Sequence, residues 1–274
     1  MMLDRVILHM LGRIPGPLRR RVIGSPENPS RAATFVHNLL NFRPSAQDEV
    51  FTCRGPLEGC RMHVDWKRFR SFVYGTWEPD VVSAIVSALK PGMTAIDVGA
   101  HIGYYTILLA KCVGPTGQVL SLEPFPENFA LLQKNVQLNE LQQVQTFPKA
   151  VFSRAGELTI GVPDDLSDSG NASLVHNLGA KQFHVSAITL DSLHCRPDFL
   201  KVDVEGAEYD VLLGGQETIA RSRPKMLIEL HHFDGDLAGH PVPRLLVSWE
   251  YQIQWIDRFR MTSHILTWPL RETL

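Results

Sequence analysis

From Glu78 to the C-terminus, short apolar runs alternate with segments whose apolar residues recur at helical spacing. The predicted strands are 94–98, 118–122, 144–150, 157–160, 198–204, 225–230, 251–256 and 263–267. The predicted helices are 79–89, 104–113, 126–138, 207–213 and 243–249. This alternation predicts βαβ units and a mostly parallel sheet with helices on both faces. Because the last two strands are too close for a helical crossover, we expect them to pair antiparallel at one edge of the sheet.

The first 75 residues lack this alternation, so we predict an N-terminal extension at 1–75 and the main α/β domain at 76–274. Within the extension, 1–45 predicts helices interrupted at 25–30, and 49–74 predicts a β-hairpin or short meander. The three arginines at 19–21 favour a solvated helix end, with contact to a membrane surface as the alternative. A polar run at 164–170 predicts a loop.

Composition narrows the class of protein. The chain has 274 residues, of which 44% are hydrophobic and 20% charged, as is usual for a globular protein. Its formal net charge of −2 shows none of the basic excess of nucleic-acid binders, so we expect no nucleic-acid partner. No stretch has the length of a transmembrane helix, and the scattered cysteines suit a reducing compartment, so we expect a cytoplasmic location. A bridge between Cys53 and Cys60, which flank a Gly/Pro turn, stays open.

The segment 95–105 is predicted to run from a strand through a glycine turn into a helix. In an open α/β sheet, ligands bind at the carboxyl end of such a strand. Gly99 permits the turn and a close approach of a ligand, and Gly103 permits close packing of the helix. The G-x-G-x-x-G fingerprint of dinucleotide-binding proteins would place glycines where this chain has His101 and Tyr104.

Two acidic residues favour S-adenosylmethionine over a nicotinamide dinucleotide. Asp97 near the strand end suits a cofactor that carries an ammonium and a sulfonium group but no phosphate. Glu123 follows the second strand, where an acid accepts hydrogen bonds from ribose hydroxyls. The predicted cofactor-binding residues are Asp97, Gly99, Ala100, His101, Gly103, Tyr104, Glu123, Pro124, Asn128, Ala150, Val151 and Asp203.

Five segments of this sequence resemble the FkbM family of methyltransferases, over roughly 77–232. They are Gly75–Pro79 (GTWEP), Asp97–Tyr105 (DVGAHIGYY), Glu123–Asn128 (EPFPEN), Lys201–Glu208 (KVDVEGAE) and Glu229–His231 (ELH). The resemblance implies a class I methyltransferase Rossmann-like fold, with a mostly parallel seven-stranded sheet and an antiparallel edge strand. It also implies S-adenosylmethionine as the methyl donor and transfer to a hydroxyl of a sugar, glycolipid or natural product. His101 departs from the asparagine usual in the family.

Methyl transfer to a hydroxyl requires a group that removes the proton. Asp203 and Glu205 are predicted to share one side at the end of a strand, and His231 follows the next strand as the candidate general base. The predicted catalytic residues are therefore His231, Asp203 and Glu205. A divalent metal such as Mg²⁺ or Mn²⁺ on these three residues is an alternative that their spacing does not require, so no metal is assigned.

The acceptor itself is not encoded in these patterns. We expect a small-molecule, glycan or lipid-linked hydroxyl compound. Two alternatives stay open beside it: an N-methyltransferase acting on protein or RNA, and a non-catalytic protein that binds S-adenosylmethionine. The oligomeric state is not predicted.

Overall fold

The computed structural model describes part of the chain. The described residues are 49–162, 181–232, 235–259 and 261–270, together with the backbone of 24–25 and 28–29. The chain divides into two compact units, 1–47 with 65–67 and 48–64 with 68–274. In the first unit, β1 (Gly24–Ser25) and β2 (Asn28–Pro29) pair antiparallel. The helices predicted within 1–45 on either side of the break at 25–30, the arginines at 19–21 and the loop at 164–170 lie outside the described residues, and the domain boundary at 75 stays a prediction.

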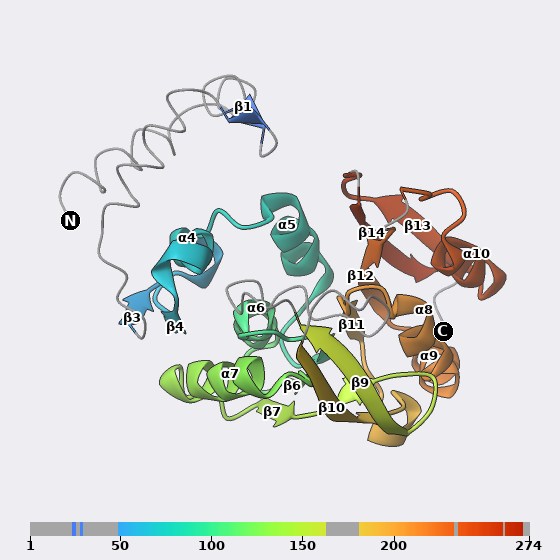
Figure 1. Ribbon diagram of the computed structural model, residues 1–274, viewed down its shortest axis with the longest axis horizontal. Helices are drawn as coiled ribbons and strands as arrows, with labels where there is room; N and C mark the ends of the chain where they lie inside the picture. The colour runs from blue at the N-terminus through green and yellow to red at the C-terminus, as the bar shows by residue number, and fades with distance from the viewer. Residues whose placement is uncertain are drawn as a thin grey trace. The chain divides into compact units, whose positions relative to one another are not determined.

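A seven-stranded sheet of order β13-β14-β12-β11-β5-β6-β7 forms the centre of the second unit (Figure 1). Its strands are β5 (Thr94–Val98), β6 (Gln118–Leu122), β7 (Val144–Phe147), β11 (Phe199–Val202), β12 (Lys225–His231), β13 (Tyr251–Trp255) and β14 (Thr262–Pro269). Parallel pairing joins β12, β11, β5, β6 and β7, whereas β14 is antiparallel to both of its neighbours. This topology confirms the predicted class I methyltransferase fold.

The antiparallel strand differs from the prediction in its position. It was expected at the edge, but β14 lies between β12 and β13, and β13 forms the edge. The burial patterns explain this order. Consecutive residues 263–265 of β14 are buried, which requires cover on both faces, whereas β13 alternates between covered and exposed residues as edge strands do.

Helices connect the strands in two series. They are α5 (Pro79–Ala88), α6 (Tyr104–Val113), α7 (Pro126–Leu138), α8 (Glu208–Leu213), α9 (Gln216–Ser222) and α10 (Pro241–Ser248). The chain runs outward from β5 to β7 on one side and from β11 to β12 on the other. Since crossovers between parallel strands are right-handed, the two series cover opposite faces of the sheet. The strand order therefore reverses between β5 and β11.

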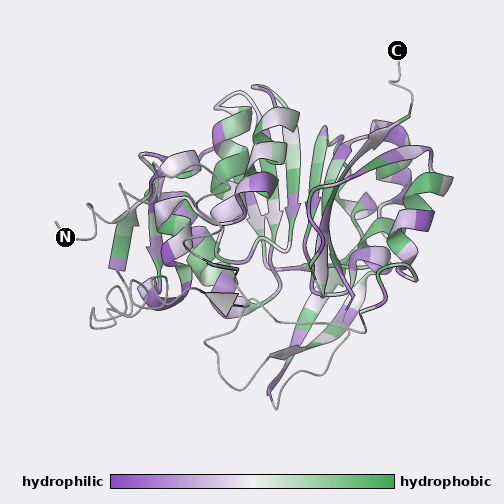
Figure 2. Ribbon diagram, turned by 90° about the horizontal axis from the view of Figure 1, so that it is seen from above, coloured by the Kyte–Doolittle hydropathy of each residue, from purple (hydrophilic) through white to green (hydrophobic). Residues whose placement is uncertain are grey.

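The inner strands are buried on both faces, and Figure 2 shows apolar, green stretches among the strands at the centre of the sheet. Ile96 and Val98 on β5, and Leu200 and Val202 on β11, are fully buried and belong to one hydrophobic cluster with Ile228 on β12. Burial on both faces is typical of parallel strands covered by helices on both sides. This rigid core fixes the carboxyl ends of the strands relative to one another.

For residues 49–74, the sequence predicted a β-hairpin or a short meander, and the structure contains a hairpin followed by a helix. β3 (Glu49–Thr52) and β4 (Arg61–Val64) pair antiparallel, and α4 (Trp66–Tyr74) follows them. The strand prediction for 65–74 is wrong because Phe69, Phe72 and Val73 recur at helical spacing. All four cysteines are free thiols, so Cys53 and Cys60 form no bridge.

A small second sheet of order β8-β10-β9 lies beside the main one. It consists of β8 (Ala150–Val151), β9 (Gly156–Val162) and β10 (Lys181–Ile188). The predicted strand 144–150 is thus two strands, because Pro148 interrupts it. The prediction missed β10, although Val185 and Ala187 alternate with polar residues and are buried. Within the described part of the chain, no helix is long and apolar enough to cross a membrane.

Candidate active site

The glycine turn and the acidic segment after β11 meet where the strand order reverses. Gly99 has φ +78°, and a β-carbon on it would lie 1.7 Å from the carbonyl oxygen of Asp203. The Asp203 amide in turn donates a hydrogen bond to the Val98 carbonyl, 3.0 Å away. Only glycine fits this approach, and the two predicted segments form one site at the carboxyl edge of the sheet.

Glu123 ties the end of β6 to the glycine turn. Its Oε2 accepts from the His101 amide at 2.8 Å, and its Oε1 accepts from the Phe125 amide at 2.9 Å. Burial raises the pKa of this carboxyl to about 7 against these hydrogen bonds. The side chain of Asn128 makes a third hydrogen bond to Glu123, so about one of the four lone-pair sites of the carboxylate stays open to a further donor, such as a ribose hydroxyl.

His101 supports the fit of a nucleoside beside Glu123. Burial lowers the pKa of its imidazole to about 4, so the ring is neutral. Its buried Nε2 has no hydrogen-bond partner within the described structure. Buried polar atoms are normally satisfied, and a ligand in this position would satisfy this one. The donor set therefore fits the nucleoside portion of S-adenosylmethionine.

The other predicted cofactor residues divide between the turn and the small sheet. Asn128 is buried and hydrogen-bonded to Glu123, and Pro124 lies directly after that carboxylate. Ala100, Gly103 and Tyr104 form the end of the turn and the start of α6, where Gly103 has φ +95°. Ala150 and Val151 are buried in β8 of the small sheet. Their contacts with a cofactor stay predictions.

A buried lysine stands between two of the predicted acids. Lys201 Nζ lies 3.4 Å from Asp97 Oδ1 and 3.2 Å from Asp203 Oδ2. Although burial lowers the pKa of Lys201, the two carboxylates raise it above its ordinary value, and the lysine lowers the pKa of Asp203 in return. Asp97 also accepts a hydrogen bond from Thr106 Oγ1 at 2.7 Å. Asp97 thus faces Lys201, and its predicted contact with a cofactor ammonium group stays a prediction.

The structure brings the three predicted catalytic residues together. One potential ligand atom from each of Asp203, Glu205 and His231 lies within 4.8 Å of the others. His231 Nε2 is 3.2 Å from Glu205, and Nδ1 is 2.8 Å from Glu208. Burial lowers the pKa of His231, but these two carboxylates raise it to about 12. The ring is therefore protonated at neutral pH, with both nitrogens directed at carboxylates.

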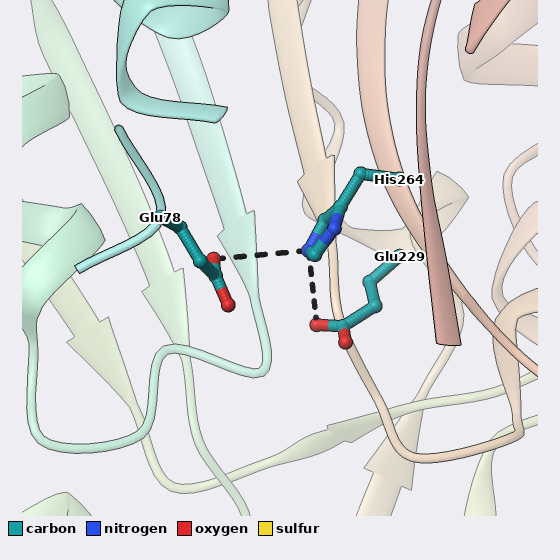
Figure 3. A group of neighbouring side chains, drawn as sticks. All are labelled: Glu78, Glu229 and His264. Carbon is teal, nitrogen blue, oxygen red and sulfur yellow. Dashed lines mark ion pairs between the residues drawn. The ribbon is translucent and has the colours of Figure 1, made fainter. Parts of the chain in front are cut away.

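A second group of side chains lies next to the first and was not predicted as a unit. Figure 3 shows Glu78, Glu229 and His264 pointing toward one another. Glu78 precedes α5, while Glu229 and His264 are opposite residues on β12 and β14. The Tyr105 hydroxyl donates to Glu78. Burial raises the pKa of Glu78 to about 7 and raises that of Glu229 as well.

Sequence signals existed for some of these residues. Glu78 and Glu229 lie within segments that carried the family resemblance, and Lys201 is two residues before Asp203, on the same side of β11. His264 had no such signal. Its place depends on the register of β14, which pairs it with Glu229.

Comparison with known proteins agrees with the fold. The Methyltransferase FkbM domain pattern matches residues 97–265, more than half of the chain. The chain belongs to the FkbM methyltransferase family. The matched residues include Glu123, the group Asp203, Glu205 and His231, and Glu229 and His264 of the second group. Glu78 lies before the matched range. This part of the chain is a S-adenosylmethionine-dependent methyltransferase domain.

Several curated proteins are similar over part of their length. "Methyltransferase 1" of Beauveria bassiana is 24% identical over 52% of this chain and 66% of that protein. "2-O-methyltransferase NoeI" of Sinorhizobium fredii is 26% identical over 57% of this chain and 73% of that protein. "Protein-L-isoaspartate O-methyltransferase 1" of Arabidopsis thaliana is 34% identical over 28% of this chain. The chain thus spans just under two thirds of the first relative and less than a third (30%) of the Arabidopsis protein.

Among solved structures, the methyltransferase FkbM from Methylobacillus flagellatus has a TM-score of 0.48 at 19% identity. The similarity covers 70% of this chain and 51% of that one.

Proposed function

We propose that this FkbM-family protein transfers a methyl group from S-adenosylmethionine to a hydroxyl of a sugar, glycolipid or natural-product acceptor. The observation that carries this proposal is the concentration of carboxylates and histidines beside Asp203. Carboxylates of raised pKa accept both hydrogen bonds and protons from hydroxyl groups. The similarity to a protein named 2-O-methyltransferase supports an oxygen acceptor.

The charges of the site suit this cofactor. S-adenosylmethionine supplies an electrophilic methyl group on a positively charged sulfur. Carboxylates outnumber the cationic groups Lys201, His231 and His264 around the end of β11. The acids are Asp97, Asp203, Glu205, Glu208, Glu229, Glu78 and Asp257. With the ribose on Glu123, the positive end of the cofactor would face this excess of negative charge.

Glu205 is the proton acceptor that this geometry favours. Burial raises its pKa, which brings its basicity closer to what removal of a hydroxyl proton requires. His231, protonated between Glu205 and Glu208, would hold the Glu205 carboxylate in place and would not itself take the proton. Asp203, whose pKa Lys201 lowers, stays ionised and would accept a hydrogen bond from the acceptor hydroxyl.

Glu205→Gln is expected to lower turnover by about 100-fold or more, because it removes a general base and keeps the side-chain shape. Affinity for S-adenosylhomocysteine should stay within about twofold, since Glu205 lies on the acceptor side. Methylation rates and calorimetric titration measure the two effects. Glu217→Gln, at an exposed position on α9, is the matched control. Wild-type turnover in Glu205→Gln would remove Glu205 from the mechanism.

Glu123→Gln is expected to weaken S-adenosylhomocysteine binding by about 2 kcal/mol, or roughly 30-fold, because it removes charge-assisted hydrogen bonds to the ribose. Wild-type affinity should also fall as pH decreases below 7, since the Glu123 carboxyl has a pKa of about 7 and its ionised form binds best. Isothermal titration between pH 6 and 8 measures both. Exposed Glu127→Gln, four residues away, should behave as wild type. Unchanged affinity in Glu123→Gln would contradict this placement of the ribose.

Direct titration with S-adenosylhomocysteine, NADH and NADPH tests the proposed function first. Micromolar binding of S-adenosylhomocysteine alone is expected, followed by methylation of hydroxylated glycans or lipids supplied as acceptors. Binding of a nicotinamide alone would overturn the proposal. Methylation of amines only would favour the N-methyltransferase alternative. Binding of S-adenosylhomocysteine without methylation of any supplied acceptor would favour a non-catalytic protein. The proposed cytoplasmic location rests on the four free thiols.

A further inference from the structure

The group Glu78, Glu229 and His264 has a geometry that ion pairing alone does not explain. His264 Nε2 lies 3.4 Å from Glu229 Oε2 and 3.7 Å from Glu78 Oε2. Charge-assisted hydrogen bonds have lengths of about 2.7–2.9 Å. On the same imidazole, Nδ1 reaches that length, at 2.9 Å from Asp257 Oδ2. The ring is therefore fixed from one side, while the other side faces two carboxylates across a wider gap.

The width of this gap fits a bound cation. Ligand atoms about 2.1 Å from a metal ion are about 3.4 Å apart in tetrahedral and about 3.0 Å apart in octahedral coordination. The three side chains converge on one point from the start of α5, from β12 and from β14, as Figure 3 shows. All three ligand atoms lie within 4.8 Å of one another, so small side-chain shifts complete the contact.

The surroundings provide the partners that metal ligands usually have. Asp257 accepts from both the backbone amide and Nδ1 of His264, which leaves Nε2 directed at the gap. A carboxylate behind a histidine in this way fixes its orientation toward a metal. Tyr105 holds Glu78 in the same manner. The side chains of Glu78 and Glu229 are 22% and 16% exposed, so further coordination positions are open to water or an acceptor.

The neighbouring group Asp203, Glu205 and His231 is the weaker candidate. His231 has a carboxylate 2.8 Å from Nδ1 and another 3.2 Å from Nε2, so the gap between its Nε2 and the facing carboxylate is narrower than the gaps of 3.4 Å and 3.7 Å at His264. Among the described residues of the two groups, His264 Nε2 is therefore the imidazole nitrogen with more room for a metal ion beside it.

We propose that Glu78, Glu229 and His264 form a binding site for a divalent metal ion, oriented by Asp257. Two carboxylate oxygens and one imidazole suit a first-row ion such as Mn²⁺. Bound there, the ion would coordinate an acceptor oxygen beside Asp203 and lower the pKa of its hydroxyl. That consequence rests on the proposed function, whereas metal binding itself does not.

Titration of the tag-free full chain with MnCl₂ tests the site. Electron paramagnetic resonance of free Mn²⁺ is expected to show one saturable site per chain, and nitrogen modulation of the bound ion should report an imidazole ligand. His264→Ala is expected to weaken binding at least tenfold, and Asp257→Asn about 10–100-fold, as second-shell losses do. His184→Ala, an exposed histidine on β10, is the matched control and should bind as wild type.

Three results would overturn this site: no saturable binding below about 1 mM, equal affinity in His264→Ala, or no nitrogen modulation in the wild-type protein. The wild-type spectrum decides the matter even if a variant does not fold. Binding of S-adenosylhomocysteine is measured separately, without Mn²⁺. Absence of metal binding therefore does not contradict the proposed methyl transfer, and absence of cofactor binding does not contradict the metal site.

Discussion

Replacing Gly99 with alanine is expected to lower the free energy of unfolding by about 2–5 kcal/mol and to impair S-adenosylhomocysteine binding. The added β-carbon would lie 1.7 Å from the Asp203 carbonyl oxygen, so the turn or the end of β11 must move. Overpacking of this kind costs about 1–3 kcal/mol. The left-handed backbone of Gly99, with φ +78°, adds about 1–2 kcal/mol for any residue with a β-carbon.

Gly59→Ala separates these two effects. Gly59 has φ +83°, close to that of Gly99, but its β-carbon would meet no atom within 4 Å. Its expected loss is about 1–2 kcal/mol, from the backbone alone. Urea unfolding of both variants and the wild type measures the difference. Equal destabilisation by the two substitutions would show that β5 and β11 do not approach as closely as described.

Lys201→Met is expected to destabilise the protein by about 3–5 kcal/mol, the usual cost of leaving buried charges without their partner. The side chain of Lys201 is 4% exposed and stands between the carboxylates of Asp97 and Asp203. Methionine fills a similar volume but leaves both carboxylates without a cation. Lower pH should recover part of the lost stability, because unpaired buried carboxylates have raised pKa values and protonation removes their charge.

Lys225→Met is the matched control for this prediction. Lys225 is the first residue of β12, which pairs with the strand β11 that carries Lys201, and it is exposed to solvent. Surface substitutions of this type change stability by at most about 0.5 kcal/mol. Thermal and urea unfolding of the two variants measure the contrast. A stability change as small in Lys201→Met as in Lys225→Met would mean that the lysine does not compensate the two acids.

Much of the site followed from local signals. A strand, a glycine turn and a helix at 94–113, followed by an acid at the end of the next strand, placed Gly99, His101 and Glu123 in one predicted site, and the structure brings them together. The alternation of strands and helices predicted a parallel sheet, because period and spacing are local properties of a chain. The same reasoning missed β10 and α4.

The chemistry of individual groups depended on contacts that no local pattern contains. His231 was predicted as a base from its ordinary pKa near neutrality, but Glu205 and Glu208 raise that pKa to about 12. The position of β14 inside the sheet follows from burial on both faces, and it places His264 opposite Glu229.

The amino-acid sequence by itself therefore determined the class of fold and the positions of most strands along the chain, and it assigned Gly99 and Glu123 to one predicted cofactor site. Only the tertiary structure decided which carboxylates pair with Lys201, His231 and His264, because burial and the separation of charges set the protonation of these groups. Residues such as Lys201 and His264 acquire their partners through strand pairing across the sheet, and the strength of those interactions depends on distances of a few ångströms.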